Sequence, residues 1–350
     1  PGQPVLIDQD ITLVEDRDFD QAQAQFMRRV GDHQFIAGTL QLWGEDDASV
    51  ELEYSGETLV GGPDSRIPLC GQIPLPCGQL EDSGDLRVES YYLQDIWSIT
   101  PQLTLELAAY YDRVEDLSPF GQAPTTSGFD PRAGLIYTPN TRNTFRLAAF
   151  RAIQPILSAR TDPTEIAGIP VFRNDFSGSE HEVVAGAWEY GWDSGLAALS
   201  LSRRNITSDF ADRRLKGHRK NLEVDVNQLL KPNIGVYGRY RYLKVEDERY
   251  PDSDRKEHLF QAGLRYVRPD GISIGAVQTF RNMNLTDRQD KETLAITDIE
   301  FAYELPDKAG ELRLDVRNVF DQEFNWVTDP LTLQGREPGR AITARVSLNF

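Results

Sequence analysis

Long apolar runs, basic residues and cysteines are all scarce in this sequence of 350 residues. No segment approaches the roughly 18 consecutive apolar residues of a transmembrane helix, and the mean hydropathy is −0.47. This excludes a helical membrane protein but not a transmembrane β-barrel, because strands that alternate apolar and polar residues have a low average hydropathy. The 37 Lys and Arg residues are outnumbered by 55 Asp and Glu residues, for a net charge of −18. We therefore expect no nucleic-acid partner.

The two cysteines, Cys70 and Cys77, lie close together in a stretch rich in Gly and Pro. There is no second cysteine pair and no nearby histidine, which argues against a zinc site. We therefore expect a local disulfide, worth roughly 2 to 3 kcal/mol of stability in the chain-entropy model. A disulfide indicates an oxidising compartment, such as the periplasm or the cell surface.

Motifs for catalysis and metal binding are also lacking. The four histidines are scattered, with no i, i+4 pair. The sequence has no G-x-S-x-G, no phosphate-binding glycine loop and no single-cysteine nucleophile. We expect no cofactor, no metal ion and no enzyme activity.

The sequence does contain a regular alternation of apolar and polar residues, which is clearest at its end. Ile342, Ala344, Val346 and Leu348 are apolar, whereas Thr343, Arg345, Ser347 and Asn349 are polar. Such a segment is a strand with one apolar and one polar face. In a soluble sandwich the apolar face would meet a second sheet. In an outer-membrane barrel it meets lipid, and the polar face lines the lumen.

Similar segments recur along the chain. Fifteen segments are recognisable, and with a weakly patterned one at 5–13 we expect about sixteen strands. Short turns near residues 31, 101, 140, 194, 232, 270 and 308 alternate with long polar connections near residues 14, 60, 120, 165, 211, 250, 287 and 330. Short periplasmic turns and long extracellular loops are typical of transmembrane barrels. We predict one all-β domain over 1–350, an antiparallel up-and-down transmembrane barrel with long extracellular loops near 44–85, 113–129, 153–180 and 321–340.

Charged residues on the polar faces of these strands are the candidate functional residues. They are Glu106, Arg132, Arg146, Glu223, Asp225, Arg239, Arg241, Arg265, Asp298, Glu300, Arg313, Asp315 and Arg345. They could form an electrostatic path for a solute, as rings of charge do in pores. Alternatively, opposite charges pair across strands and only brace a wet lumen. The sequence leaves both roles open and favours the second.

Three stretches resemble the barrel of TonB-dependent outer-membrane receptors. Residues 92–105 are similar to the hairpin pattern Q-D-x-W-x-I-T-x-x-L-x-L, and residues 131–155 to P-R-x-G-L-x-Y … R. Residues 314–320, followed by 338–340 and the last strand, are similar to N-L-F … P-G-R … F. The terminal Phe350 also resembles the C-terminal signal that the barrel-assembly machinery reads. This resemblance implies a bacterial outer-membrane protein with Phe350 at the periplasmic rim.

The sequence departs from that family in size. Members usually have about 22 strands and an N-terminal plug with a TonB-contacting segment. The present sequence matches neither the plug nor that segment, and at roughly 22 residues per strand we expect only about sixteen strands. Residues 161–168 resemble outer-membrane proteins in which periplasmic tetratricopeptide repeats precede a receptor-like barrel. Because Pro1 is not an initiator methionine, we expect an upstream portion of the protein.

These patterns together predict transport of a solute or polymer across the Gram-negative outer membrane. The alternative is a barrel that anchors a periplasmic repeat domain or a surface assembly and transports nothing. A soluble β-protein is a third and weaker interpretation. The expected partners are outer-membrane lipid and lipopolysaccharide, the barrel-assembly machinery, and a periplasmic or inner-membrane protein.

Overall fold

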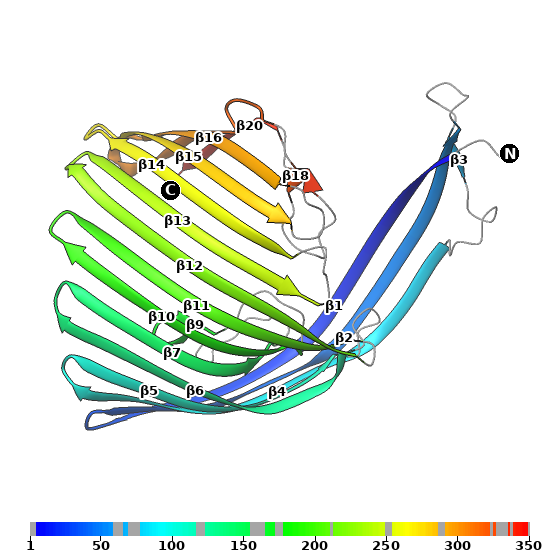
Figure 1. Cartoon of the computed structure of the whole chain (residues 1–350), viewed down its shortest axis with the longest axis horizontal. Coiled ribbons are helices and arrows are strands. Elements are labelled where there is room, and N and C mark those ends of the chain that lie inside the picture. Colours follow the sequence, from blue (N-terminus) through cyan, green and yellow to red (C-terminus); the bar gives the residue numbers. More distant parts are fainter. Residues whose placement is uncertain are drawn as a thin grey trace.

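The computed structural model describes residues 5–58, 66–68, 78–116, 123–154, 165–171, 178–210, 213–248, 254–285, 291–322, 325–326, 335–336 and 339–348. Fifteen antiparallel strands form one sheet in which each strand pairs with the next one along the chain (Figure 1). They are β1 (Val5–Val30), β2 (His33–Thr58), β4 (Gly78–Thr100), β5 (Leu103–Asp116), β6 (Ala123–Asn140), β7 (Asn143–Ile153), β10 (Glu180–Trp192), β11 (Gly195–Phe210), β12 (Arg213–Lys231), β13 (Ile234–Asp247), β14 (Arg255–Val267), β15 (Ile272–Leu285), β16 (Lys291–Glu304), β17 (Gly310–Arg317) and β20 (Ala341–Leu348).

The remaining elements are short. The strand β3 (Arg66–Pro68) pairs with β2, and two small hairpins consist of β8 (Glu165–Ile166) with β9 (Ile169–Pro170) and of β18 (Asn325–Trp326) with β19 (Gly335–Arg336). A single 3₁₀ turn, η2 (Pro306–Lys308), joins β16 to β17. Within the described part of the chain, we find no helix with the length and apolar character that crossing a membrane requires.

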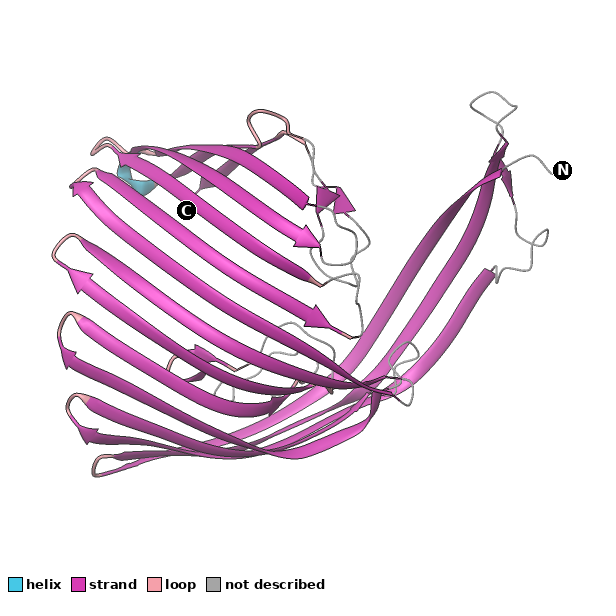
Figure 2. Cartoon of the chain, in the orientation of Figure 1, coloured by secondary structure: helices cyan, strands magenta, loops and turns pink. Residues whose placement is uncertain are grey.

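The sheet is strongly curved, and its short turns gather along one rim, at the left of Figure 2. Turns occur at 31–32, 101–102, 141–142, 193–194, 232–233, 269–270 and η2, which confirms the predicted positions of the short turns. The prediction of an all-β, antiparallel, up-and-down architecture is also confirmed. The strands β1 and β20 are the two ends of the sheet.

The strand register gives the sheet two chemically different faces. Alternate side chains of a strand point to opposite faces, and the pairing keeps like faces together across the sheet. The outer face carries exposed apolar residues, among them Leu201, Val226, Phe260, Leu264, Phe280 and Phe301. The inner, concave face carries charged and amide side chains in the same strands. In β1 to β7 the inner face is more apolar, with Leu42, Val88 and Val114 buried in one cluster with Ile153.

The first strands are longer than the sequence predicts. β1 is continuous over 26 residues, so the predicted separate strand at 5–13 and the connection near residue 14 are wrong. β2 continues to Thr58 and β4 begins at Gly78, so much of the predicted loop 44–85 is paired strand. Segments 5–20, 45–58 and 78–89 contain 16 acidic and two basic residues. Spanning the membrane takes only roughly 9 to 11 residues per strand, and backbone pairing beyond that length requires no apolar alternation.

The other long connections lie near their predicted places. β5 ends at Asp116 and β6 begins at Ala123, so the connection is shorter than the predicted 113–129. The predicted loop 153–180 lies between β7 and β10, and the predicted loop 321–340 lies between β17 and β20. Cys70, Cys77 and Phe350 lie outside the described residues, and their predicted disulfide and assembly signal stay predictions.

The stability cost of a new charge should differ between the outer and the inner face of the sheet. Ala276 lies on the outer face five residues after the turn at Gly271, near the middle of an apolar band about 25 Å tall. We expect Ala276→Arg to lower the unfolding free energy of the vesicle-inserted protein by about 2 to 4 kcal/mol. The adjacent Val277 lies on the inner face opposite Asp298, and Val277→Arg should cost less than about 1 kcal/mol. Urea unfolding followed by tryptophan fluorescence measures both, and equal losses would contradict the assignment of the faces.

Candidate functional site: the charged inner face

The strand register places all thirteen charged residues singled out from the sequence on the inner face. Cross-strand pairs link Glu223 to Arg241 and Asp225 to Arg239, and Glu300 to Asp315. On the same face, in β5 to β7, Glu106 lies opposite Gly134 and Arg146 lies opposite Ile136. The set therefore lies on one face of the sheet, on β5 to β7 and on strands between β12 and β20.

The inner face between β12 and β17 carries two ion-paired groups near the short-turn rim. In the first, Arg239 Nε lies 3.2 Å from Glu223 Oε1 and donates to Asp225 Oδ1 at 2.6 Å. In the second, Glu300 pairs with both Arg265 and Arg313, and the Arg313–Glu300 distance is 3.1 Å. Arg313 also bonds Asp315 at 3.0 Å. Seven of the thirteen candidates are thus held in two groups of compensated charge.

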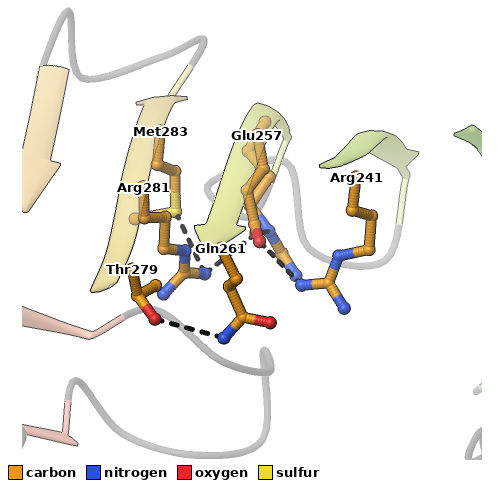
Figure 3. Close-up of polar contacts among 7 residues, drawn as sticks. Arg241, Glu257, Gln261, Thr279, Arg281 and Met283 are labelled. Atoms are coloured by element: carbon orange, nitrogen blue, oxygen red, sulfur yellow. Dashed lines mark hydrogen bonds and ion pairs between the residues drawn. The ribbon is translucent and has the colours of Figure 1, made fainter. Parts of the chain in front are cut away.

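A third group lies farther from that rim and is centred on Glu257 (Figure 3). The Glu257 carboxylate accepts hydrogen bonds from Arg241 at 2.9 Å and Arg281 at 2.8 Å. Arg255 Nε lies 3.8 Å away. The Glu257 side chain is only 2% exposed, so this carboxylate is shielded from water and depends on its arginines for solvation.

The remaining candidates contact other parts of the fold. Arg132 lies over the Tyr110 ring, with Cζ 3.4 Å from the ring centroid, a cation–π arrangement. Asp298 accepts the backbone N–H of Asn318 at 2.8 Å and so holds the end of β17. Arg345 lies directly opposite Arg313 in the pairing of β17 with β20.

Glu106 and Arg146 hold the small β8–β9 hairpin against the inner face. Glu106 Oε2 accepts the N–H of Ala167 at 2.8 Å, and Arg146 donates to the Ala167 carbonyl at 3.3 Å. Ala167 has φ of 51°, a left-handed conformation that is strained for alanine. Ile166 and Ile169 pack into a buried cluster with Phe150 and its neighbours. The hairpin is therefore an integral part of the inner surface.

Glycine at position 134 makes room for this hairpin. A Cβ at Gly134 would lie 2.8 Å from Ala167 Cβ and 2.9 Å from Ile166 Cγ1. Real carbon atoms do not approach so closely, so a larger residue must displace the hairpin or the strand.

Four members of the inner-face charge groups were missed by the sequence reasoning. Glu257, Arg255 and Arg281 belong to the third group, and Glu189 pairs with Arg146 at 3.4 Å. Glu257 is an even number of residues from Arg265 in the same strand, so the alternation that identified Arg265 could have found it. Its deep burial had no signal in the sequence, because it depends on arginines from neighbouring strands.

Most of these charges are compensated within the fold. This arrangement favours the bracing role, since cross-strand ion pairs hold neighbouring strands together. The partners in each pair are unequally exposed, however. The side chains of Arg239 and Arg265 are 47% and 53% exposed, whereas those of Asp225 and Glu300 are 26% and 25% exposed. Between β12 and β17 the arginines are therefore the more exposed partners. In the pair between β7 and β10 the order is reversed, since the Glu189 side chain is 41% exposed and that of Arg146 is 24% exposed. Among the described residues, no three His, Cys, Asp or Glu side chains are arranged to hold a metal ion.

A curved antiparallel sheet with an apolar outer face and a charged inner face is the architecture of an outer-membrane β-barrel. Residues 7–192 match the family model described as TonB dependent receptor-like, beta-barrel. The chain belongs to this family, whose members are outer-membrane proteins of Gram-negative bacteria. No curated protein sequence matches the chain.

Solved structures of similar fold are also receptors of this type. The ferric-catecholate import receptor Fiu of E. coli K12, in its closed form, superposes with a TM-score of 0.63 at 16% identity, covering 97% of this chain and 55% of that one. The siderophore receptor PiuA of Acinetobacter baumannii gives a TM-score of 0.67 at 13% identity, covering 96% and 56%. The copper transporter OprC gives 0.64 at 14% identity, covering 97% and 59%. The chain thus spans somewhat more than half the length of these receptors.

The burial of Glu257 predicts a large effect of its removal. Glu257→Gln would leave Arg241 and Arg281 without their shared counter-charge, and we expect the unfolding free energy to fall by about 3 to 5 kcal/mol. Glu300 also lies between two arginines but is one quarter exposed, so Glu300→Gln should cost about 1 kcal/mol or less. Urea titration of both variants in the same vesicles tests this, and equal midpoints would refute the role of burial.

The space left by Gly134 should be necessary for docking of the β8–β9 hairpin. Gly134→Val should displace β8–β9 and expose Ile166, which is 1% exposed in the structure. In a protein with Cys70 and Cys77 replaced by serine, an Ile166→Cys reporter measures this through its rate of labelling by a polar maleimide. We expect Gly134→Val to speed labelling by about five- to a hundredfold, the equivalent of roughly 1 to 3 kcal/mol of overpacking. The matched control is Ala133→Val on the outer face of the same strand, which should leave the rate unchanged. Similar labelling in both variants would show that the hairpin is not docked as described.

Proposed function

We propose that this chain forms the barrel of an outer-membrane receptor that carries a solute across the Gram-negative outer membrane along its inner face. Family membership and the solved receptors support this proposal. The observation that carries it is the inner face between β12 and β17, where the Arg239, Arg265 and Arg313 side chains are more exposed than the carboxylates that pair with them. An anionic solute could contact these guanidinium groups while each arginine keeps its protein partner.

The similar receptors suggest a first class of cargo to test. They are a ferric-catecholate import receptor, a siderophore receptor and a copper transporter. Together with the exposed arginines, they favour an anionic metal–chelate complex over a neutral solute. On the basis of family membership, we also propose that the barrel couples to an inner-membrane TonB protein.

Ion selectivity in a planar bilayer tests the proposed path. The full-length protein should give stable conductance steps that favour chloride over potassium in a tenfold KCl gradient, because arginines are the more exposed members of the pairs. The double variant Arg239→Glu and Arg265→Glu should shift the reversal potential toward cation selectivity. The control is Arg142→Glu, which changes charge at an exposed short turn away from both ion-paired groups and should leave selectivity unchanged.

Two outcomes would count against this function. Cation-selective steps from the unmodified protein would contradict an arginine-lined path. A protein that inserts and folds but conducts nothing would instead favour the alternative function, a barrel that anchors a periplasmic or surface assembly.

A further inference from the structure

Four basic residues lie side by side across four neighbouring strands of the outer face. Arg203 of β11 is directly opposite Lys220 of β12, Lys220 is opposite Lys244 of β13, and Lys244 is opposite Lys256 of β14. We call this set the basic row. Arg203, Lys220 and Lys256 are exposed, and Lys244 is half-buried.

The row lies at the upper border of the apolar outer surface. Two residues closer to the short-turn rim, each strand of the row places an apolar or aromatic side chain on the same face, namely Leu201, Leu222, Tyr242 and His258. Lys244 is eleven residues beyond Asn233, the last residue of its short turn. At about 3.3 Å per residue and a tilt of roughly 40°, this separation is about 28 Å along the membrane normal. The apolar band of such barrels is about 25 Å tall.

Adjacent like charges across strands destabilise a sheet, so the row calls for anionic partners. Glu246 pairs with Lys244, and Asp254 accepts the N–H of Asp247 at 2.6 Å. His218, also on this face, bonds Asn205 at 3.0 Å. Glu182 is diagonal to Arg203 across β10 and β11 and also lines the groove described below. Among the described residues, three carboxylates, Glu182, Glu246 and Asp254, thus lie beside the four cations of the row.

An apolar groove of about 990 Å³ leads to the row across the outer face. Its floor includes small side chains such as Ala133 and Ala149. The cross-strand partners run from Phe35 through Asp95, Leu107, Ala133, Ala149 and Val184 to Arg203. The groove therefore follows the same line of residues that continues as the basic row. Because the strands are tilted, this line rises from near the short-turn rim to the upper border of the apolar surface.

We propose that the groove and the basic row form a binding site for a lipopolysaccharide molecule of the outer leaflet. The row binds its lipid A phosphates through charge-assisted hydrogen bonds, and the groove holds an acyl chain. Lipopolysaccharide fits this site for three reasons. Its phosphates are anionic, the row lies at the upper border of the apolar surface, and the groove follows the same line of residues as the row. The proposal rests on the proposed function, and on the barrel orientation expected from the sequence, in which the short turns lie at the periplasmic side.

The test uses the full-length protein and bis-phosphorylated deep-rough lipopolysaccharide in mixed vesicles. The triple variant Lys220→Gln, Lys244→Gln and Lys256→Gln should bind this lipid at least about tenfold more weakly. The control variant Lys231→Gln, Arg268→Gln and Lys308→Gln removes the same charge at the short turns and should bind normally. Replacing the three row lysines by arginine should preserve binding, and heat-modifiable gel mobility shows that each variant is folded.

Several results would overturn the site. They are unchanged binding by the triple variant, equal weakening by the control variant, or equal affinity of the unmodified protein for dephosphorylated lipid. The row faces away from the inner lining, so the triple variant should keep its ion selectivity. Loss of lipid binding with normal selectivity therefore separates this proposal from the proposed function.

Discussion

The structure depends on a single constraint, the antiparallel register that keeps alternate residues of every strand on the same side of the sheet. A slip of one residue in any strand would move its charges to the apolar face and its aromatic residues to the wet one. Such a slip would place Arg239 or Glu300 in lipid, at a cost of several kcal/mol per charge. The register is therefore held both by the backbone ladder and by the opposite chemistry of the two faces.

Charge compensation is the second organising feature of the inner face. Near the short-turn rim, carboxylates are partly exposed and pair with arginines that extend further from the sheet. Farther up, Glu257 is enclosed by arginines from both sides. Paired charges stabilise a polar lining without leaving unsatisfied ions. Between β12 and β17 the arginines are the more exposed members of these pairs, and this difference in exposure is the physical basis for the solute class that we propose.

The sequence predicted those parts of the fold in which the membrane imposes a pattern. Alternation such as Thr297, Ile299 and Phe301 against Asp298 and Glu300 identified both the strands and their faces, because lipid and water meet opposite sides there. Where water contacts both sides, as in the acidic outer parts of β1 and β2, the pattern disappears although the backbone pairing continues. The β8–β9 hairpin was not foreseen either. It depends on contacts between Ala167 and Glu106, which are far apart in the sequence, and on the absence of a side chain at Gly134.

The measurement that tests the central claim most directly is site-directed spin labelling of the membrane-spanning part of β15, from Ile272 to Phe280. With the protein in lipid vesicles, the accessibility of each label to oxygen and to a water-soluble nickel complex reports its surroundings. The account predicts a strict alternation, with even positions accessible to oxygen and odd positions accessible to nickel. Labels that show no alternation, or uniform accessibility to the nickel complex, would contradict a sheet with one face in lipid and the other lining a wet interior.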